Sequence, residues 1–170
     1  MDKNTCCFFG HRKIVTTDIL KAKLYHIIEC LIITENVDTF LFGCNSDFND
    51  LCYQIVCSLK INYPHIRRIY VRAQFPYINE EYRSHLLQQY EETYFPQHML
   101  NAGKSRYVER NYEMINKSKF CIVYFDDKCS PPRRKNKNTD LLDYQPKSGT
   151  AISIAYAAKK QKNIINILKI

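Results

Sequence analysis

Four short clusters of residues in this sequence carry groups suited to binding an anion. They are Gly10-His11-Arg12, the stretch from Gly43 to Asp47 with Asn45 and Ser46, the group Arg106, Arg110 and Asn111, and Ser148-Gly149-Thr150. Imidazole and guanidinium groups donate hydrogen bonds to phosphate oxygens. Small residues let a ligand approach the backbone, and free N–H groups at helix N-termini attract phosphate. Together the clusters predict a cradle for a nucleotide-like ligand.

Two of these clusters also have simpler explanations. Ser148-Gly149-Thr150 is a common helix start, because Ser and Thr are favoured N-caps. His11 is equally suited to a local hydrogen bond, and Arg12 to a solvated surface position. The prediction of a ligand site therefore rests on the convergence of the clusters at one place.

The cluster of Arg106, Arg110 and Asn111 has two interpretations of nearly equal weight. Arg106 and Arg110 are four residues apart and share one helix face, where Glu109 and Glu113 offer partners for a surface ion-pair network. Alternatively the two guanidinium groups point at phosphate or ribose, to which Arg donates two hydrogen bonds at once.

Hydrophobic periodicity predicts the elements that position these clusters. Apolar runs at 5–9, 39–42 and 66–71 are typical of strands, and helical spacing from Thr17 to Leu31 and from Leu51 to Leu59 predicts a helix after each of the first two. This alternation requires parallel strands joined by crossover helices. Ligands bind parallel sheets at the carboxyl ends of the strands, so the clusters that follow the strands are expected there.

The second half of the chain continues the alternation. We expect a helix over 105–116, a strand buried on both faces over 119–125, a helix from Ser148 to Lys160 and a last strand over 163–168. The predicted fold class is therefore α/β, with a mostly parallel central sheet and helices on both faces.

Two segments do not fit the alternation. Residues 73–104 combine a helix around 80–90 with a Tyr-rich, Pro-broken connection, and we expect an insertion or lid there. Residues 126–147 are polar, basic and contain three prolines, which is typical of a mobile loop. Neither segment resembles an interdomain linker, so residues 1–170 are expected to form a single domain.

Composition indicates an ordinary globular protein. The chain has 170 residues, of which 45% are hydrophobic and 25% charged, enough to bury one core. No apolar run approaches the roughly 18 to 20 residues of a membrane-spanning helix, and the first residues do not resemble a signal peptide. We therefore expect a cytoplasmic protein with no membrane partner.

The eight cysteines lie mostly in apolar stretches, and no CxxC pair occurs. Zinc sites usually show two close Cys pairs, or a Cys pair followed by a His pair. We therefore expect reduced core thiols and predict neither a metal site nor a cofactor.

The formal net charge of +8 is partly local. One stretch holds Lys128, Arg133, Arg134, Lys135 and Lys137, partly offset by Asp126, Asp127 and Asp140. The rest is spread along the chain. A diffuse basic surface suits a phosphate ligand or non-specific contact with nucleic acid, and solubility alone explains it equally well.

Four segments, in order, match a known family. They are FFGHR, FLFGCNSDFNDLCYQIVCSLK, RYVERNYEMINKSKFCIVYF and SGTAISIAYAAKKQKNIINI. This order resembles the YpsA-like branch of the SLOG superfamily, which also includes the SMF/DprA and LOG proteins, and the resemblance covers nearly the whole chain. It implies a single Rossmann-like domain with a nucleotide-related site at these loops. Carried over by position, the implied site residues are Gly10, His11, Arg12, Gly43, Arg110, Asn111, Gly149 and Thr150.

Two positions depart from the family pattern. Relatives have a Gly-rich second loop ending in Phe-Asp, whereas Asn49 follows Phe48 here. LOG-type phosphoribohydrolases carry a Glu three residues after the Thr of their final loop, and here that residue is Ser153. Cleavage of an N-glycosidic bond passes through an oxocarbenium-like state that needs a nearby carboxylate. The sequence therefore argues against that hydrolase activity.

The favoured hypothesis is a non-catalytic module that binds or senses a nucleotide or nucleotide-sugar, ADP-ribose-derived ligands included. In it Arg12 and Arg110 add charge, and Tyr or His rings stack on the base. Related proteins often dimerise, so a homodimer is a further expectation.

Two alternatives stay open. One is a nucleoside-monophosphate N-glycosidase whose acid is Glu109, Glu113 or Asp47. The other, less favoured, is binding of single-stranded DNA through Arg133, Arg134, Lys135 and the tyrosines.

Overall fold

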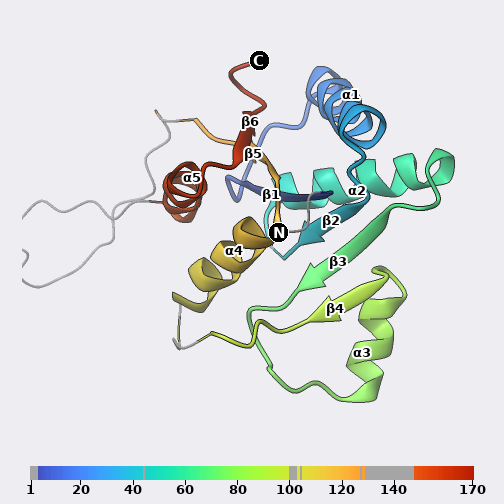
Figure 1. Ribbon diagram of the computed structural model, residues 1–170, viewed down its shortest axis with the longest axis vertical. Coiled ribbons are helices and arrows are strands. Elements are labelled where there is room, and N and C mark those ends of the chain that lie inside the picture. Colours follow the sequence, from blue (N-terminus) through green and yellow to red (C-terminus); the bar gives the residue numbers. More distant parts are fainter. Residues whose placement is uncertain (1–3, 44, 100–102, 104, 127, 129–147) are drawn as a thin grey trace, which may run out of the picture.

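Short apolar segments of this chain pair into one parallel sheet. The computed structural model describes residues 4–43, 45–99, 103, 105–126, 128 and 148–170. Within them the strands are β1 (Thr5–Gly10), β2 (Thr39–Phe42), β3 (Arg67–Val71), β4 (Glu92–Tyr94), β5 (Phe120–Tyr124) and β6 (Asn163–Asn166). Their order in the sheet is β4-β3-β2-β1-β5-β6, and every neighbouring pair is parallel (Figure 1).

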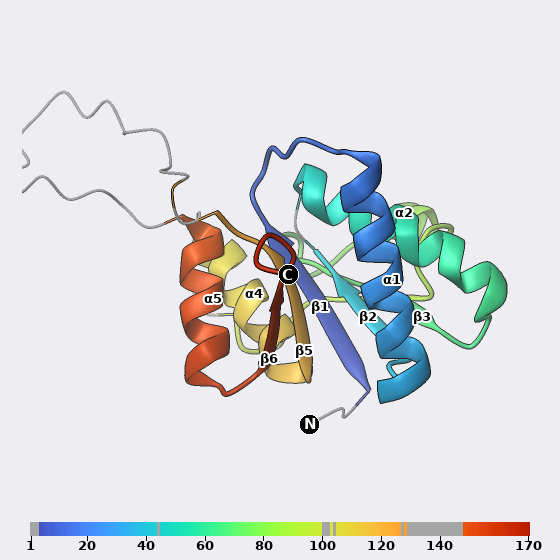
Figure 2. The same cartoon turned by 90° about the horizontal axis from the view of Figure 1, so that it is seen from above.

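Helices cover both faces of this sheet, as the sequence predicts. They are α1 (Asp18–Glu35), α2 (Asp47–Asn62), α3 (Glu80–Leu87), α4 (Ser105–Lys117) and α5 (Gly149–Lys159). Because side chains alternate along a strand, Phe8 packs with α1 and α2 while Phe9 packs with α4 and α5. Figure 2 shows α1 and α2 on one side of the sheet and α4 and α5 on the other. The α/β, Rossmann-like class is confirmed.

Three helices begin with a hydroxyl cap in the connection that follows a strand. The hydroxyl oxygens of Thr17, Ser46 and Ser148 accept from backbone N–H groups three residues on, at 3.1, 3.2 and 3.1 Å. Each cap satisfies an N–H group that the helix itself leaves without a partner.

The sheet reverses its direction of growth beside β1. Strands β2, β3 and β4 are added on one side of β1, and β5 and β6 on the other. The loops after β1 and β5 therefore diverge, which makes the carboxyl ends of these two strands a topological switch point. The expected burial of β5 is also observed, since Phe120 to Val123 are buried between β1 and β6.

The segment 73–104 holds an element that the sequence analysis missed. Strand β4 has only three residues, but it pairs with β3 and forms one edge of the sheet. Helix α3 ends at Leu87, so it is shorter than expected. Whether the segment moves as a lid stays a prediction. The predicted mobile loop 126–147 lies outside the described residues apart from Asp126 and Lys128.

Four of the described cysteines are core thiols. Cys6, Cys7, Cys52 and Cys121 are buried, whereas Cys30 and Cys57 are half-buried. Burial raises the pKa of the Cys6, Cys7 and Cys52 thiols well above its ordinary value. Cys44 and Cys129 lie outside the described residues. None of the helices in the described ranges is long and apolar enough to cross a membrane.

Candidate ligand site at the carboxyl edge of the sheet

The loop after β1 spans the switch point through His11. The His11 N–H donates to the Tyr124 carbonyl at 3.2 Å, and the Asp126 N–H donates to His11 Nε2 at 2.9 Å. Because Nε2 accepts, the neutral ring carries its proton on Nδ1. The imidazole also packs against the Phe125 ring, with centroids 5.6 Å apart. His11 therefore makes the local hydrogen bond that was the simpler of its two explanations.

Gly10 and Arg12 contact the first residues of α2. A Cβ at Gly10 would lie 2.5 Å from Cδ1 of Phe48, so the glycine makes room for a ring of the protein itself. The Arg12 carbonyl accepts from the Asp47 N–H at 2.9 Å, while its side chain is exposed. The absence of a Cβ at Gly10 is thus explained by packing against Phe48.

The N-terminus of α2 is a poor site for an anion. The Asp47 N–H is bonded to the Arg12 carbonyl, and Ser46 Oγ caps the Asn49 N–H. Two carboxylates, Asp47 and Asp50, lie in the first turn, and burial and the charge of Asp47 raise the pKa of Asp50. These charges repel phosphate and offset the favourable helix dipole. Asn45, just before this turn, is exposed.

The N-terminus of α5 has the opposite character. Ser148 Oγ accepts from the Ala151 N–H. This cap does not use the N–H groups of Gly149 and Thr150, and the first turn of α5 contains no carboxylate. Within the part of the chain that the structure describes, a Cβ at Gly149 would have no other atom within 4 Å, so the backbone there is open to a ligand. This helix start has the features that favour phosphate.

A chain of hydrogen bonds joins three of the clusters beneath this edge. Arg110, only 4% exposed, donates from Nη1 to the Gly43 carbonyl and from Nε to Asn111 Oδ1 at 3.0 Å. Asn111 Nδ2 donates to Ser153 Oγ at 3.0 Å, and that hydroxyl donates to the Gly149 carbonyl at 2.9 Å. The end of β2 is thereby linked through α4 to the first residue of α5.

Gly43 is needed for this chain. A Cβ there would lie 2.7 Å from the Val71 carbonyl oxygen and 2.8 Å from Cδ of Arg110. The guanidinium groups of Arg106 and Arg110 lie 5.6 and 5.9 Å from the Tyr107 ring centroid. Arg110 thus acts inside the fold, while Arg106 is half-buried at its surface.

Ser153, at the position of the hydrolase glutamate, is fully buried. Asp47 pairs with Lys13 at 3.3 Å, and Glu113 pairs with Lys117 at 3.2 Å in the last turn of α4. Glu109 is half-buried in α4. Two of the three candidate acids are therefore already engaged in ion pairs.

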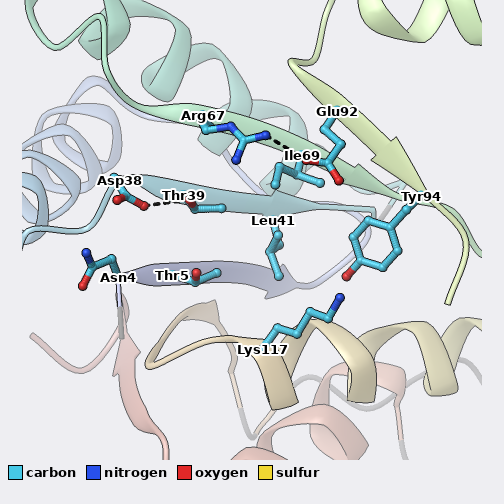
Figure 3. Close-up of a pocket in the computed structure, with 10 residues that line it drawn as sticks. All are labelled: Asn4, Thr5, Asp38, Thr39, Leu41, Arg67, Ile69, Glu92, Tyr94 and Lys117. Carbon is cyan, nitrogen blue, oxygen red and sulfur yellow. Dashed lines mark hydrogen bonds and ion pairs between the residues drawn. The ribbon is translucent and has the colours of Figure 1, made fainter. Parts of the chain in front are cut away.

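A cavity of about 660 Å³ opens at the opposite edge of the sheet. It is lined by residues in or just before β1 to β4 and by the end of α4. These are Asn4, Thr5, Asp38, Thr39, Leu41, Arg67, Ile69, Glu92, Tyr94 and Lys117 (Figure 3). Its cationic groups are paired, because Arg67 meets Glu92 at 2.8 Å and Lys117 meets Glu113. None of the predicted site residues lines it.

The chain was compared with family models, curated proteins and solved structures. No family model matches the chain, and no curated protein does. Among solved structures, the chain is similar to DNA processing protein A from Helicobacter pylori, which has a unique single-stranded DNA binding mode. The two proteins share a fold.

The match with DNA processing protein A has a TM-score of 0.54 and 16% sequence identity. It covers 95% of this chain but 64% of DNA processing protein A, so this chain spans less than two thirds of that protein's length. The likeness concerns the fold alone.

Ser153 and the loop after β3 contribute to this edge and were not predicted as part of the site. Ser153 was considered only as the residue that replaces a glutamate. Ser153 lies four residues after Gly149 on α5, and this spacing indicates a hydrogen bond from its hydroxyl to the first residue of the helix. The exposed rings of the loop after β3 gave no such signal, because aromatic residues usually indicate a core.

Proposed function

We propose that this protein is a non-catalytic SLOG-type module of the YpsA-like branch that binds a nucleotide or nucleotide-sugar at the carboxyl edge of its sheet. The phosphate lies at the N-terminus of α5, on the N–H groups of Gly149 and Thr150. The observation that carries the proposal is the open, carboxylate-free start of α5, which a chain of hydrogen bonds through α4 links to Gly43 after β2. ADP-ribose-derived ligands belong to this class.

The side chains of the edge have different roles in this proposal. Arg12 is exposed and supplies positive charge to the ligand. Arg110 is a positioning residue, because its guanidinium is buried against Gly43 and Asn111. Asp47 disfavours phosphate at the start of α2 and so directs it to α5. The buried Ser153 supports a binding rather than a hydrolytic role.

The test is calorimetry with adenine nucleotides, ADP-ribose and cyclic derivatives, on the parent protein and on Gly149→Asp. An aspartate in the first turn favours the helix and meets no steric obstacle, but it repels phosphate. We expect the variant to fold normally and to lose at least about tenfold in affinity, equivalent to about 1.4 kcal/mol.

The matched control is Gln54→Glu, which adds the same charge at an exposed position on α2. It should leave binding unchanged. Folded parent protein that binds none of these compounds, or a Gly149→Asp variant that binds as well as Gln54→Glu does, would refute the proposal.

A second candidate function is binding of single-stranded DNA. The shared fold with DNA processing protein A and the net charge of +8 favour it. Phosphates of a strand would then occupy the same edge of the sheet. Binding of a strand and binding of a free nucleotide differ in their dependence on salt.

A further inference from the structure

The loop between β3 and α3, residues 73–79, follows the carboxyl end of β3 (Figure 1). It carries two exposed aromatic rings. Phe75 is 61% exposed and Tyr77 is 93% exposed. We call this segment the aromatic loop. Isolated exposed apolar residues are common, but two large rings within three residues are an exposed apolar patch in need of an explanation.

The backbone at Phe75 makes this exposure more unusual. Its φ angle of 56° lies in the left-handed region, which disfavours bulky side chains. The conformation is held by Arg72, whose Nη1 donates to the Phe75 carbonyl at 2.5 Å and whose N–H donates to the Tyr94 carbonyl at 2.8 Å. The turn itself would be better served by glycine, so the aromatic ring is not there for the turn.

A third ring joins this surface from α4. Tyr107, 39% exposed, is hydrogen-bonded through its hydroxyl to Gln74 Nε2 of the aromatic loop. The guanidinium of Arg106 lies 5.6 Å from the Tyr107 ring centroid. Rings interleaved with cationic side chains are the surface on which unpaired bases stack, because every base has a π face and every linkage a negative charge.

We propose that Phe75, Tyr77 and Tyr107 form a stacking platform for the bases of a single nucleic-acid strand, with Arg106 beside its phosphates. This inference rests on the second candidate function and names the residues that would carry it. Three strand spacings, about 14 Å, separate the ends of β5 and β3, so linked nucleotides can reach both α5 and the platform. Three aromatic rings also suit several linked bases better than a single base.

The experiment measures binding of a fluorescent oligothymidylate of about 12 nucleotides, a length within the range of such sites. The variants are Phe75→Gly, which the left-handed backbone accommodates, and Tyr77→Ala, whose side chain is almost fully exposed. Each should weaken binding about tenfold, whereas Phe75→Tyr, which keeps a ring, should bind like the parent protein. The control Ile61→Ala removes an 83% exposed apolar side chain at the far end of α2 and should change nothing.

The outcomes separate this inference from the function on which it rests. If the folded parent protein does not bind the oligonucleotide, the second candidate function fails and the platform fails with it. If the parent binds but Phe75→Gly and Tyr77→Ala bind equally well, only the platform is overturned. Two further results would overturn the stacking of a strand. One is an abasic strand that binds the parent protein as tightly as oligothymidylate does. The other is thymidine monophosphate whose affinity falls as much in Phe75→Gly and Tyr77→Ala as the affinity of the strand does.

Discussion

At the scale of single residues, both glycines that end the first two strands are explained by the protein's own side chains. Gly10 accommodates the Phe48 ring, and Gly43 accommodates Arg110. Glycine after a strand is often taken as a sign of close ligand approach. Here Gly149 is the predicted site glycine that has open space beside it.

This difference gives a prediction about stability. Gly10→Ala places a methyl group 2.5 Å from Cδ1 of Phe48, and we expect the free energy of unfolding to fall by about 1–3 kcal/mol, the usual cost of overpacking. Gly149→Ala meets no atom within 4 Å and should be neutral or slightly stabilising. Urea unfolding of the two variants gives both values.

A second substitution tests the cause. In a chain that already carries Gly10→Ala, Phe48→Leu replaces the ring by a smaller side chain. It should cost less there than it costs in the parent protein, because it relieves the clash. Equal stability of the Gly10→Ala and Gly149→Ala variants would show that Phe48 moves aside without cost.

At the scale of elements, the edge strand β4 is held by charged hydrogen bonds from β3. Arg68 donates from Nη2 to Glu91 Oε1 at 2.6 Å, and its backbone N–H donates to Oε2 at 2.5 Å. Partial burial alone would raise the pKa of Glu91, but the hydrogen bonds from Arg68 outweigh it and lower the pKa below its ordinary value. The interaction compensates for the shortness of β4.

The lowered pKa determines the sign of a pH effect. Glu91 is more acidic in the folded state than in the unfolded state, so its contribution is complete above about pH 5 and is lost as pH falls through the folded value. We expect Glu91→Gln to lower the free energy of unfolding by about 1–2 kcal/mol at about pH 7 and by much less at about pH 3. Urea unfolding at both pH values measures this.

The exposed ion pair between Arg67 and Glu92 on the same strands is the matched control. Glu92→Gln should cost less than about 0.5 kcal/mol at about pH 7, because solvent screens exposed pairs. If the loss of unfolding free energy in Glu91→Gln does not change with pH, this result would contradict the lowered pKa of Glu91.

At the scale of the whole molecule, the protein carries a net charge of +8, and the salt dependence of its binding separates the two candidate functions. Binding of a single strand through about three phosphate contacts should weaken about 20-fold between about 50 and 200 mM salt, because bound counterions are released. A mononucleotide with one such contact should lose about threefold or less. Anisotropy with the oligonucleotide and calorimetry with the nucleotide, in the same salt series, measure both.

These two slopes indicate which ligand the edge of the sheet is built for. A steep slope for the strand together with weak nucleotide binding favours the second candidate function. An oligonucleotide affinity that does not change with salt would contradict binding through phosphates. The expected homodimer stays a prediction, which the mass of the protein in solution would check.

Much of the architecture was readable from the sequence, because it depends on local patterns. Apolar runs and helical spacing identified five of the described strands and placed the starts of α1, α4 and α5. Strand β4 was missed since three residues cannot show a period, and its stability comes from pairing with β3 and from Glu91. Helix starts were found because caps act within three residues.

The sequence by itself determined which residue types gather at the carboxyl edge, since parallel strands bring the loops after them to one side of the sheet. Only the tertiary structure decided what each residue does there. Arg110 is buried against Gly43, Asp47 makes the start of α2 unfavourable for phosphate, and Gly149 is left open. The reason is physical: burial, charge and open space at a residue depend on neighbours that are distant in the chain.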